Sequence, residues 1–136
     1  MLSTNLMKYC VYTIKHSDDL AKAVEKGGKG KYTESKPWRM AEKLFAQAKK
    51  EGFILPVIFA FAERTRKVRC WARITDIKIA QATDGTVKTT YSFDKLTVFP
   101  DKRYKKNLVL KSTGKNISSN YIRPYAICVT PEYILK

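Results

Sequence analysis

The most regular hydrophobic pattern in the chain covers residues 53–80, and we expect the rest of the fold to be organised around it. Residues 54–62 form an uninterrupted apolar run that is rich in β-branched and aromatic side chains. A run of this length and composition is typical of a strand that is buried on both faces. After a polar turn at residues 63–67, apolar and polar residues alternate from Val68 to Ile74, which is the period of a strand with one inward face. The pattern predicts a long antiparallel hairpin.

The alternation in the second strand of this hairpin changes phase once. Val68, Cys70, Ala72 and Ile74 share the inward parity, but Ile77 then takes the parity that residue 76 should have had. A β-bulge or a bend produces such a shift, and bends of this kind help a sheet to curl into a barrel. We therefore expect the hairpin to be curled.

Two helices are predicted in the N-terminal half of the chain, after a first strand at residues 7–14. The first helix opens at Ser17, whose hydroxyl is suited to capping the free amide groups, and it stops at the glycine pair 27–28. The second helix has Pro37 in its first turn, where a missing amide group costs nothing, and it ends at Gly52.

The C-terminal half reads as strands separated by turns. A strand is expected from Val87 to Val98, after a turn at residues 83–86. The remaining elements are a basic loop, a short strand, a turn, a last strand and a terminal helical turn, at residues 100–106, 108–110, 112–116, 125–129 and 131–134. This order predicts an α+β fold with a small barrel of about five to six mostly antiparallel strands, in a single domain over residues 1–136.

Composition narrows the class of protein. Hydrophobic residues make up 44% of the 136 residues, which excludes wholesale disorder, and no apolar run approaches the roughly 20 residues of a membrane span. The first residues do not resemble a signal peptide. Cys10, Cys70 and Cys128 are odd in number and widely spaced, which favours reduced thiols in a cytoplasmic protein over a metal site. We expect no membrane partner, no metal and no cofactor.

Charge is the strongest signal for function. The chain has 27 Lys and Arg against 12 Asp and Glu, a formal net charge of +15. A field of this strength attracts polyanions, so we favour nucleic acid over a merely soluble, lysine-rich surface. Segment 27–33 is rich in glycine and lysine but lacks the spacing of a nucleotide-binding loop. We interpret it as a mobile basic loop that touches a nucleic-acid backbone.

Residue types give little support to catalysis. His16 is the only histidine, which excludes Ser-His-Asp triads and metal sites with several histidines. Asp18 and Asp19 are more simply read as favourable charges at the start of a helix than as an acid/base pair. We therefore predict a binding protein rather than an enzyme.

Four short stretches carry a family resemblance. Residues 7–9 open the first strand, residues 37–38 lead into an Ala-rich helix, residues 57–60 and 71–74 form the central hairpin, and residues 122–134 close the chain. Together they resemble the PUA-like superfamily, and within it most closely the EVE domains, which are relatives of YTH and ASCH domains. Residues 13–16 and 39–42 depart from the usual EVE pattern, at positions that help to form the pocket of that family.

The resemblance implies a pseudobarrel that binds RNA or DNA, and some relatives hold a single, often modified, base in an aromatic pocket. Stacking on aromatic rings beside a basic track is the general way in which single strands and flipped bases are bound. The residues expected to form the pocket are Tyr12, Thr13, Trp38, Phe61, Trp71 and Arg73. The residues expected to contact phosphates are Lys29, Lys31, Lys102, Arg103, Lys105 and Lys106.

Several alternatives stay open at this point. Trp38 is either a hydrophobic plug or one wall of the pocket, and Trp71 either presents a stacking surface with Arg73 or packs under a helix. A second function follows from the ASCH relatives, some of which are nucleases or small amidohydrolases acting through Lys, Thr and Glu or Tyr; Lys31, Thr33 and Glu63 are of these types. A third is a non-catalytic protein-interaction or regulatory domain.

Overall fold

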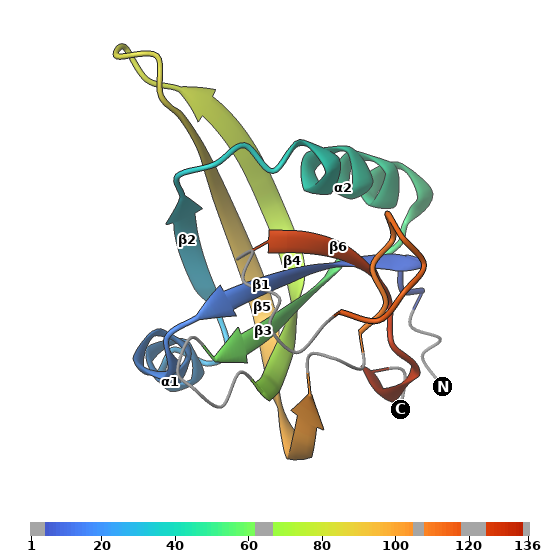
Figure 1. The fold of residues 1–136 in the computed structure, drawn as a ribbon. Helices are drawn as coiled ribbons and strands as arrows, with labels where there is room; N and C mark the ends of the chain where they lie inside the picture. Colours follow the sequence, from blue (N-terminus) through green and yellow to red (C-terminus); the bar gives the residue numbers. More distant parts are fainter. Residues whose placement is uncertain (1–4, 62–66, 105–107, 118–124, 135–136) are drawn as a thin grey trace.

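The computed structural model of the protein describes residues 5–61, 67–104, 108–117 and 125–134 (Figure 1). Glu63, Lys105 and Lys106 lie outside this part of the chain. The elements follow one another as β1 (Tyr9–Lys15), α1 (Ser17–Glu25), β2 (Gly30–Glu34), α2 (Arg39–Glu51), β3 (Pro56–Phe61), β4 (Lys67–Gln81), β5 (Val87–Tyr104), β6 (Tyr125–Val129) and the 3-10 turn η2 (Glu132–Ile134).

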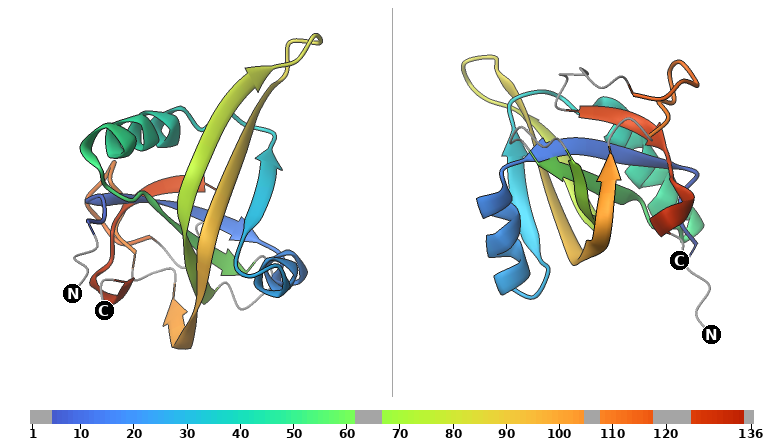
Figure 2. Two further views of the ribbon diagram at one scale, coloured as in Figure 1. Left: turned by 180° about the vertical axis from the view of Figure 1, so that it is seen from behind. Right: turned by 60° about the horizontal axis from the view of Figure 1, so that its bottom comes forward.

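The strands form one six-stranded sheet in the order β2-β5-β4-β3-β1-β6, which confirms the α+β class. β1 pairs with β3 in parallel, and the other neighbouring pairs are antiparallel, so the sheet is mixed. The sheet curls strongly around its own inner face (Figures 1 and 2). It is nevertheless not closed, because no described ladder joins the edge strands β2 and β6. The predicted barrel is therefore present only as an open, curled sheet.

The predicted central hairpin is confirmed as β3 paired with β4, and β4 pairs in turn with the long strand β5. The expected phase shift near residue 76 is also present, because Ile74 lies opposite Phe93 while Asp76 lies opposite Ser92. Two further shifts occur in the same ladder, and one of them includes Lys95 in a left-handed conformation with φ of 55°. Irregularities of this kind increase the local twist and bend the strands.

One of these shifts corrects the prediction that Val68 shares a face with Cys70. The β4–β5 register changes between these two residues, and the β3–β4 register changes at the corresponding place, between Phe59 and Ala60. As a result Cys70 packs in one hydrophobic cluster and Val68 in another.

The prediction of a basic loop at residues 27–33 is wrong for the second half of this segment, because Gly30–Glu34 forms the edge strand β2. Gly30 lets the backbone pass directly over the Phe93 ring, since a Cβ atom at this position would clash with that ring. Tyr32 and Glu34 turn inward on the same side, while Lys31 and Thr33 stay exposed. A segment that appears glycine-rich and polar is therefore a strand with a tight contact on one face.

Several predicted boundaries also move. His16 is the N-cap of α1 and Ser17 its first residue, so Ser17 does not occupy the cap position. Trp38 is the N-cap of α2, which places Pro37 before the helix rather than in its first turn. Residues 100–104 of the expected basic loop are strand instead, because the backbone continues as β5 to Tyr104. Residues 109 and 110 form only isolated bridges, although a strand was expected there.

Two hydrophobic clusters lie on opposite faces of β1 and β3. On the inner face of the curl, Val57 and Phe59 of β3 pack with residues from both helices. On the other face, Ile58 and Ala60 pack with residues that precede and follow β6. β3 is thus buried on both faces, as its continuous apolar run predicts.

Trp38 lies at the centre of the inner cluster and is only 2% exposed. Its indole stacks on the Tyr91 ring at a centroid distance of 4.8 Å and on the Tyr125 ring at 4.5 Å. Its backbone amide donates a hydrogen bond of 2.9 Å to the buried Thr89 hydroxyl, which in turn donates to the Lys36 carbonyl. Both faces of the indole are covered, so Trp38 is a core residue rather than an open pocket wall.

We expect Trp38→Ala to lower the free energy of unfolding by about 3–5 kcal/mol, because it leaves a large cavity between two rings. Thermal unfolding followed by circular dichroism should show a midpoint lower by roughly 10 °C or more. Phe53→Ala is the matched control, since Phe53 is an aromatic residue with 40% exposure and its loss should change stability by less than about 1 kcal/mol. Equal and small effects of both substitutions would contradict a core role for Trp38.

Candidate nucleic-acid interface

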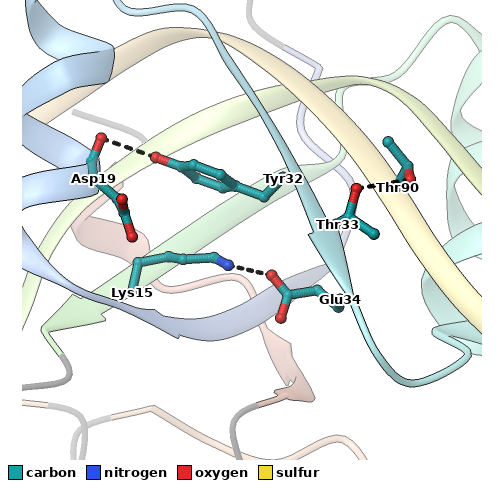
Figure 3. A network of polar contacts seen from close by, with 6 residues as sticks. All are labelled: Lys15, Asp19, Tyr32, Thr33, Glu34 and Thr90. Carbon is teal, nitrogen blue, oxygen red and sulfur yellow. Dashed lines mark hydrogen bonds and ion pairs between the residues drawn. The ribbon is translucent and has the colours of Figure 1, made fainter.

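The outer face of β2, β5 and β4 carries rows of polar side chains. Residues that lie directly opposite each other in neighbouring strands project from the same face of a sheet. One row runs from Lys31 through Ser92 to Asp76, and the next runs from Thr33 through Thr90 to Lys78. A hydrogen bond of 3.1 Å joins the Thr33 and Thr90 hydroxyls within the second row (Figure 3).

The inner face of the same three strands is apolar. Tyr32 lies opposite Tyr91, which lies opposite Ile77, and all three pack with the inner hydrophobic cluster. Core residues therefore lie on the inner side of these strands, with Glu34 turned inward beside them, whereas hydroxyls, ammonium groups and the Asp76 carboxylate lie outside. We call the outer side of β2, β5 and β4 the polar sheet face.

A groove of about 610 Å³ lies at one end of the polar sheet face. Lys26, Lys29 and Lys31 line it together with Thr75 and Ser92. Within the described ranges, none of these three lysines makes an ion pair. The groove therefore presents free ammonium groups beside hydroxyls, which is the donor set that phosphate oxygens accept.

One carboxylate in the groove is neutralised by its neighbour. Arg73 donates two hydrogen bonds to Asp94, from Nε to Oδ1 at 2.8 Å and from Nη2 to Oδ2 at 2.6 Å. These hydrogen bonds hold the pKa of Asp94 below its usual value, and the nearby charges of Lys95 and Lys29 lower it further. Asp94 therefore stays ionised and bound to Arg73, so that it offsets little of the charge of the lysines.

The six residues expected to form an aromatic pocket do not come together. Tyr12 is buried in the cluster on the far side of β1 and β3 from Trp38, and Thr13 is buried next to Tyr12 in the sequence. Trp71 packs against the same cluster as Tyr12 and not under a helix. Phe61 is half-buried at the end of β3, where it packs against the inner cluster. Arg73 is bound to Asp94, which lines the groove on the polar sheet face. The expected pocket is thus corrected, because its members point to opposite faces of the sheet.

The expected phosphate contacts divide into two groups. Lys29 and Lys31 lie in the groove. Lys102 and Arg103 belong to the opposite end of β5, where Arg103 pairs with Val68. Sequence reasoning missed Lys78, Lys88 and the row of hydroxyls, although the alternation of polar residues along β5 contained this signal. The sequence does not show the register that places residues of β2, β5 and β4 side by side.

A second polar network lies where the curl brings β1 close to β2 (Figure 3). The Lys15 ammonium forms an ion pair with Glu34, although β1 and β2 are not neighbours in the sheet. The same ammonium lies 4.5 Å from the centroid of the Tyr32 ring, and the Tyr32 hydroxyl donates to the Asp19 carbonyl. Burial, with a contribution from the nearby Asp19 charge, raises the pKa of Tyr32 to about 12. Of the residues expected for an ASCH-like site, Lys31 and Thr33 are exposed on β2 and face away from this network.

The described residues give no sign of a metal centre. No group of three or more His, Cys, Asp and Glu side chains gathers among them. Cys10, Cys70 and Cys128 are buried without disulfide bonds, and burial raises the pKa of Cys128 to about 12.

The comparisons with known proteins do not place the chain in a family. No protein-family model matches the sequence, and no curated protein matches it significantly. Neither helix that the structure describes is long and apolar enough to cross a lipid bilayer.

The Arg73–Asp94 pair should make stability depend on acid pH. Because the pKa of Asp94 is lowered in the folded state, its contribution is complete above the unfolded value of about 3.9 and disappears as the pH falls through the folded pKa. We expect Asp94→Asn to destabilise the protein at pH 7 by less than about 1 kcal/mol, since the pair is partly exposed. Denaturant titrations should show this difference shrinking below about pH 4.

The matched control for this measurement is Asp76→Asn on the same face. Its carboxylate lies 3.9 Å from the Lys78 ammonium and both side chains are exposed, so we expect almost no effect at any pH. A pH-independent loss in Asp94→Asn would show that packing, and not the ion pair, accounts for its effect.

Proposed function

We propose that this protein is a nucleic-acid-binding domain that holds a phosphate backbone against the polar sheet face. The observation that carries the proposal is the groove in which Lys26, Lys29 and Lys31 stand free beside Ser92 and Thr75. The formal net charge of +15 would draw a polyanion toward the molecule, and the groove supplies a place for it to bind. The resemblance of the sequence to PUA-like domains agrees with this function.

The chemistry of the face favours contacts to phosphates over contacts to bases. The paired rows on the polar sheet face consist of lysines, hydroxyls and one carboxylate, and Phe93, the one aromatic residue among the described residues that line the groove, is only 2% exposed. Hydroxyl and ammonium groups bind phosphate oxygens and fix the position of the strand, whereas sequence is read through contacts to bases. We therefore propose binding that tolerates many sequences, and not the selection of one flipped base.

Stacking of a base on Trp38 would need a rearrangement. The indole already lies between Tyr91 and Tyr125, so a base could enter only after one of these rings had moved. The phosphate contacts on the polar sheet face need no such movement, because its lysines are exposed.

We expect the apparent affinity for RNA or DNA to fall steeply with salt, and the slope to depend on the polar sheet face. Replacing Lys29, Lys31, Lys78 and Lys88 by Gln should make the slope of log affinity against log salt shallower by roughly 3–4, if each lysine meets one phosphate. Fluorescence anisotropy with labelled oligonucleotides of several sequences, from low to physiological salt, measures this slope.

The matched control replaces the same number of exposed lysines elsewhere, namely Lys22, Lys49, Lys50 and Lys115. It makes the same change in net charge but should leave most of the slope intact. Equal losses in the two variants would show that the charge of the whole protein, rather than this face, determines binding. If the unaltered protein shows no detectable binding to RNA or DNA at low salt, the proposal is wrong.

A second candidate function is hydrolysis of RNA or of an amide-bearing nucleoside, as the resemblance to ASCH domains suggests. The observation that favours it is the partly buried network of Lys15, Tyr32 and Glu34, which brings together the residue types expected of such a site (Figure 3). A lysine held beside a carboxylate can serve in acid–base chemistry when a substrate displaces the ion pair. The same contacts also explain the network as a structural link between β1, α1 and β2.

Chromatography of the protein incubated with short RNA and with acylated nucleosides separates these two roles. If the network is catalytic, Glu34→Gln should lower turnover by at least about 100-fold, while circular dichroism shows that the variant is still folded. For a structural link, the unaltered protein shows no turnover, and Glu34→Gln lowers only the unfolding temperature. The second outcome rejects the hydrolase function.

A further inference from the structure

A second groove lies between α2 and the start of β1, away from the polar sheet face. It has a volume of about 500 Å³, and Met7, Tyr9, Met40 and Phe53 are among the residues that line it. A smaller hollow of about 210 Å³ also borders Met40 and extends the groove toward β6. We call the two hollows together the α2 groove. They share no lining residue with the groove on the polar sheet face.

The α2 groove exposes two large apolar side chains. Met40 is 42% exposed and Phe53 is 40% exposed, whereas Met7 and Leu44 beneath them are buried. Exposed apolar side chains that gather around a hollow are typical of an interaction site, and methionine adapts its shape to different partners. Met40 stands in the first turn of α2 and Phe53 follows its last turn, so the two side chains offer apolar contacts at the two ends of the groove.

Positive charge surrounds this apolar floor. Lys8, Lys43 and Lys111 line the α2 groove, and Glu51 is the one acidic residue among the lining residues that the structure describes. The ammonium groups of Lys8 and Lys111 lie 5.7 Å and 5.1 Å from the centroid of the Tyr9 ring. The groove thus combines an apolar floor with a cationic rim.

We propose that the α2 groove binds an acidic peptide segment of a partner protein, with bulky apolar side chains packed on Met40 and on Phe53 and carboxylates facing Lys8, Lys43 and Lys111. Charge complementarity selects an acidic partner, and the apolar floor requires an anchor that a polyanion alone does not have. Grooves of this kind bind amphipathic segments through a few apolar anchors.

Two other occupants fit the site less well. A stacked nucleobase needs an open aromatic face, but two ammonium groups already lie close to the Tyr9 ring, and Phe53 is the one other aromatic residue among the described lining residues. A second copy of this chain would bring another net charge of +15 toward three lysines, which like-charge repulsion opposes. The acidic peptide satisfies both the apolar and the charged parts of the groove.

The test uses the full chain with ¹³C-labelled methionine methyl groups, because Met7 and Met40 both line the α2 groove. The probe is a short synthetic peptide in which Asp and Glu alternate with Leu and Phe. A second peptide replaces the acidic residues by Lys, and a third replaces Leu and Phe by Ser. We expect the first peptide to shift the Met7 and Met40 resonances in a saturable manner, and the other two to bind at least about tenfold more weakly.

Variants localise the binding. Met40→Ser with Phe53→Ser, and separately Lys43→Glu with Lys111→Glu, should each weaken the first peptide by about tenfold or more. The matched control is Val24→Ser with Val98→Ser, which removes exposed apolar side chains elsewhere on the molecule and should leave peptide affinity unchanged. Nucleic-acid affinity should change little in Met40→Ser with Phe53→Ser, which keeps the net charge.

Four results would overturn the proposal. They are no saturable shift at millimolar peptide, equal binding of the Lys-containing peptide, stronger shifts of Met7 and Met40 with a single-stranded oligonucleotide than with the acidic peptide, and methionine shifts that appear on concentrating the protein alone. The third result would assign the groove to nucleic acid, and the fourth would assign it to a second copy of the chain.

Discussion

The stack of Tyr91, Trp38 and Tyr125 holds the curled sheet together. Tyr91 belongs to β5, next to one edge of the sheet, and Tyr125 belongs to β6, which is the other edge. Trp38 lies between these two rings, at the start of α2. The two ends of the sheet therefore meet through aromatic side chains instead of through a backbone ladder. Removing the indole would take away this contact between the two ends and leave a cavity in the core.

In the same way, the ion pair between Lys15 and Glu34 joins two strands that are not neighbours in the sheet. β1 and β2 are separated by three strands in the sheet, yet their side chains touch across the inside of the curl (Figure 3). The Tyr32 ring strengthens this contact, because it packs at 6.3 Å from the Phe59 ring while its hydroxyl binds α1. Burial of these groups explains how an open sheet can keep its curl, because side chains join strands that no backbone ladder connects.

The curl also determines which surface is free for binding. The inner face is filled by the helices and by the aromatic stack, and the outer face near β1, β3 and β6 is covered by residues such as Leu108, Ile117 and Ile134. On β2, β5 and β4 the outer face carries hydroxyls and lysines where core residues would otherwise stand. Among the described residues, no hydrophobic cluster covers these polar rows, which is why they are available to a ligand.

Local patterns predicted much of the fold, and long-range register accounts for most of the errors. The apolar stripe and the terminal Gly52 marked α2, and the continuous run before residue 62 marked a strand buried on both faces, because each signal lies within one short segment. β2 was missed because Tyr32 is the only large apolar residue in its sequence, and its strand character depends on Phe93 packing against Gly30. A single tryptophan forms no repeating hydrophobic pattern, so the sequence alone did not decide whether Trp38 lies in the core or lines a pocket.

The two candidate surfaces use lysine in different ways, and this difference follows from their neighbours. On the polar sheet face, Lys31 and Lys78 stand in rows with hydroxyl groups, so an anion that approaches them meets hydroxyl as well as ammonium donors, with Asp76 as the one carboxylate of these rows. In the α2 groove, the ammonium groups of Lys8 and Lys111 lie over the Tyr9 ring, beside a floor of apolar side chains. A bare phosphate chain gains little from an apolar floor, whereas an acidic peptide with an apolar anchor gains from both parts. A single strongly basic chain can therefore present two binding surfaces of different selectivity.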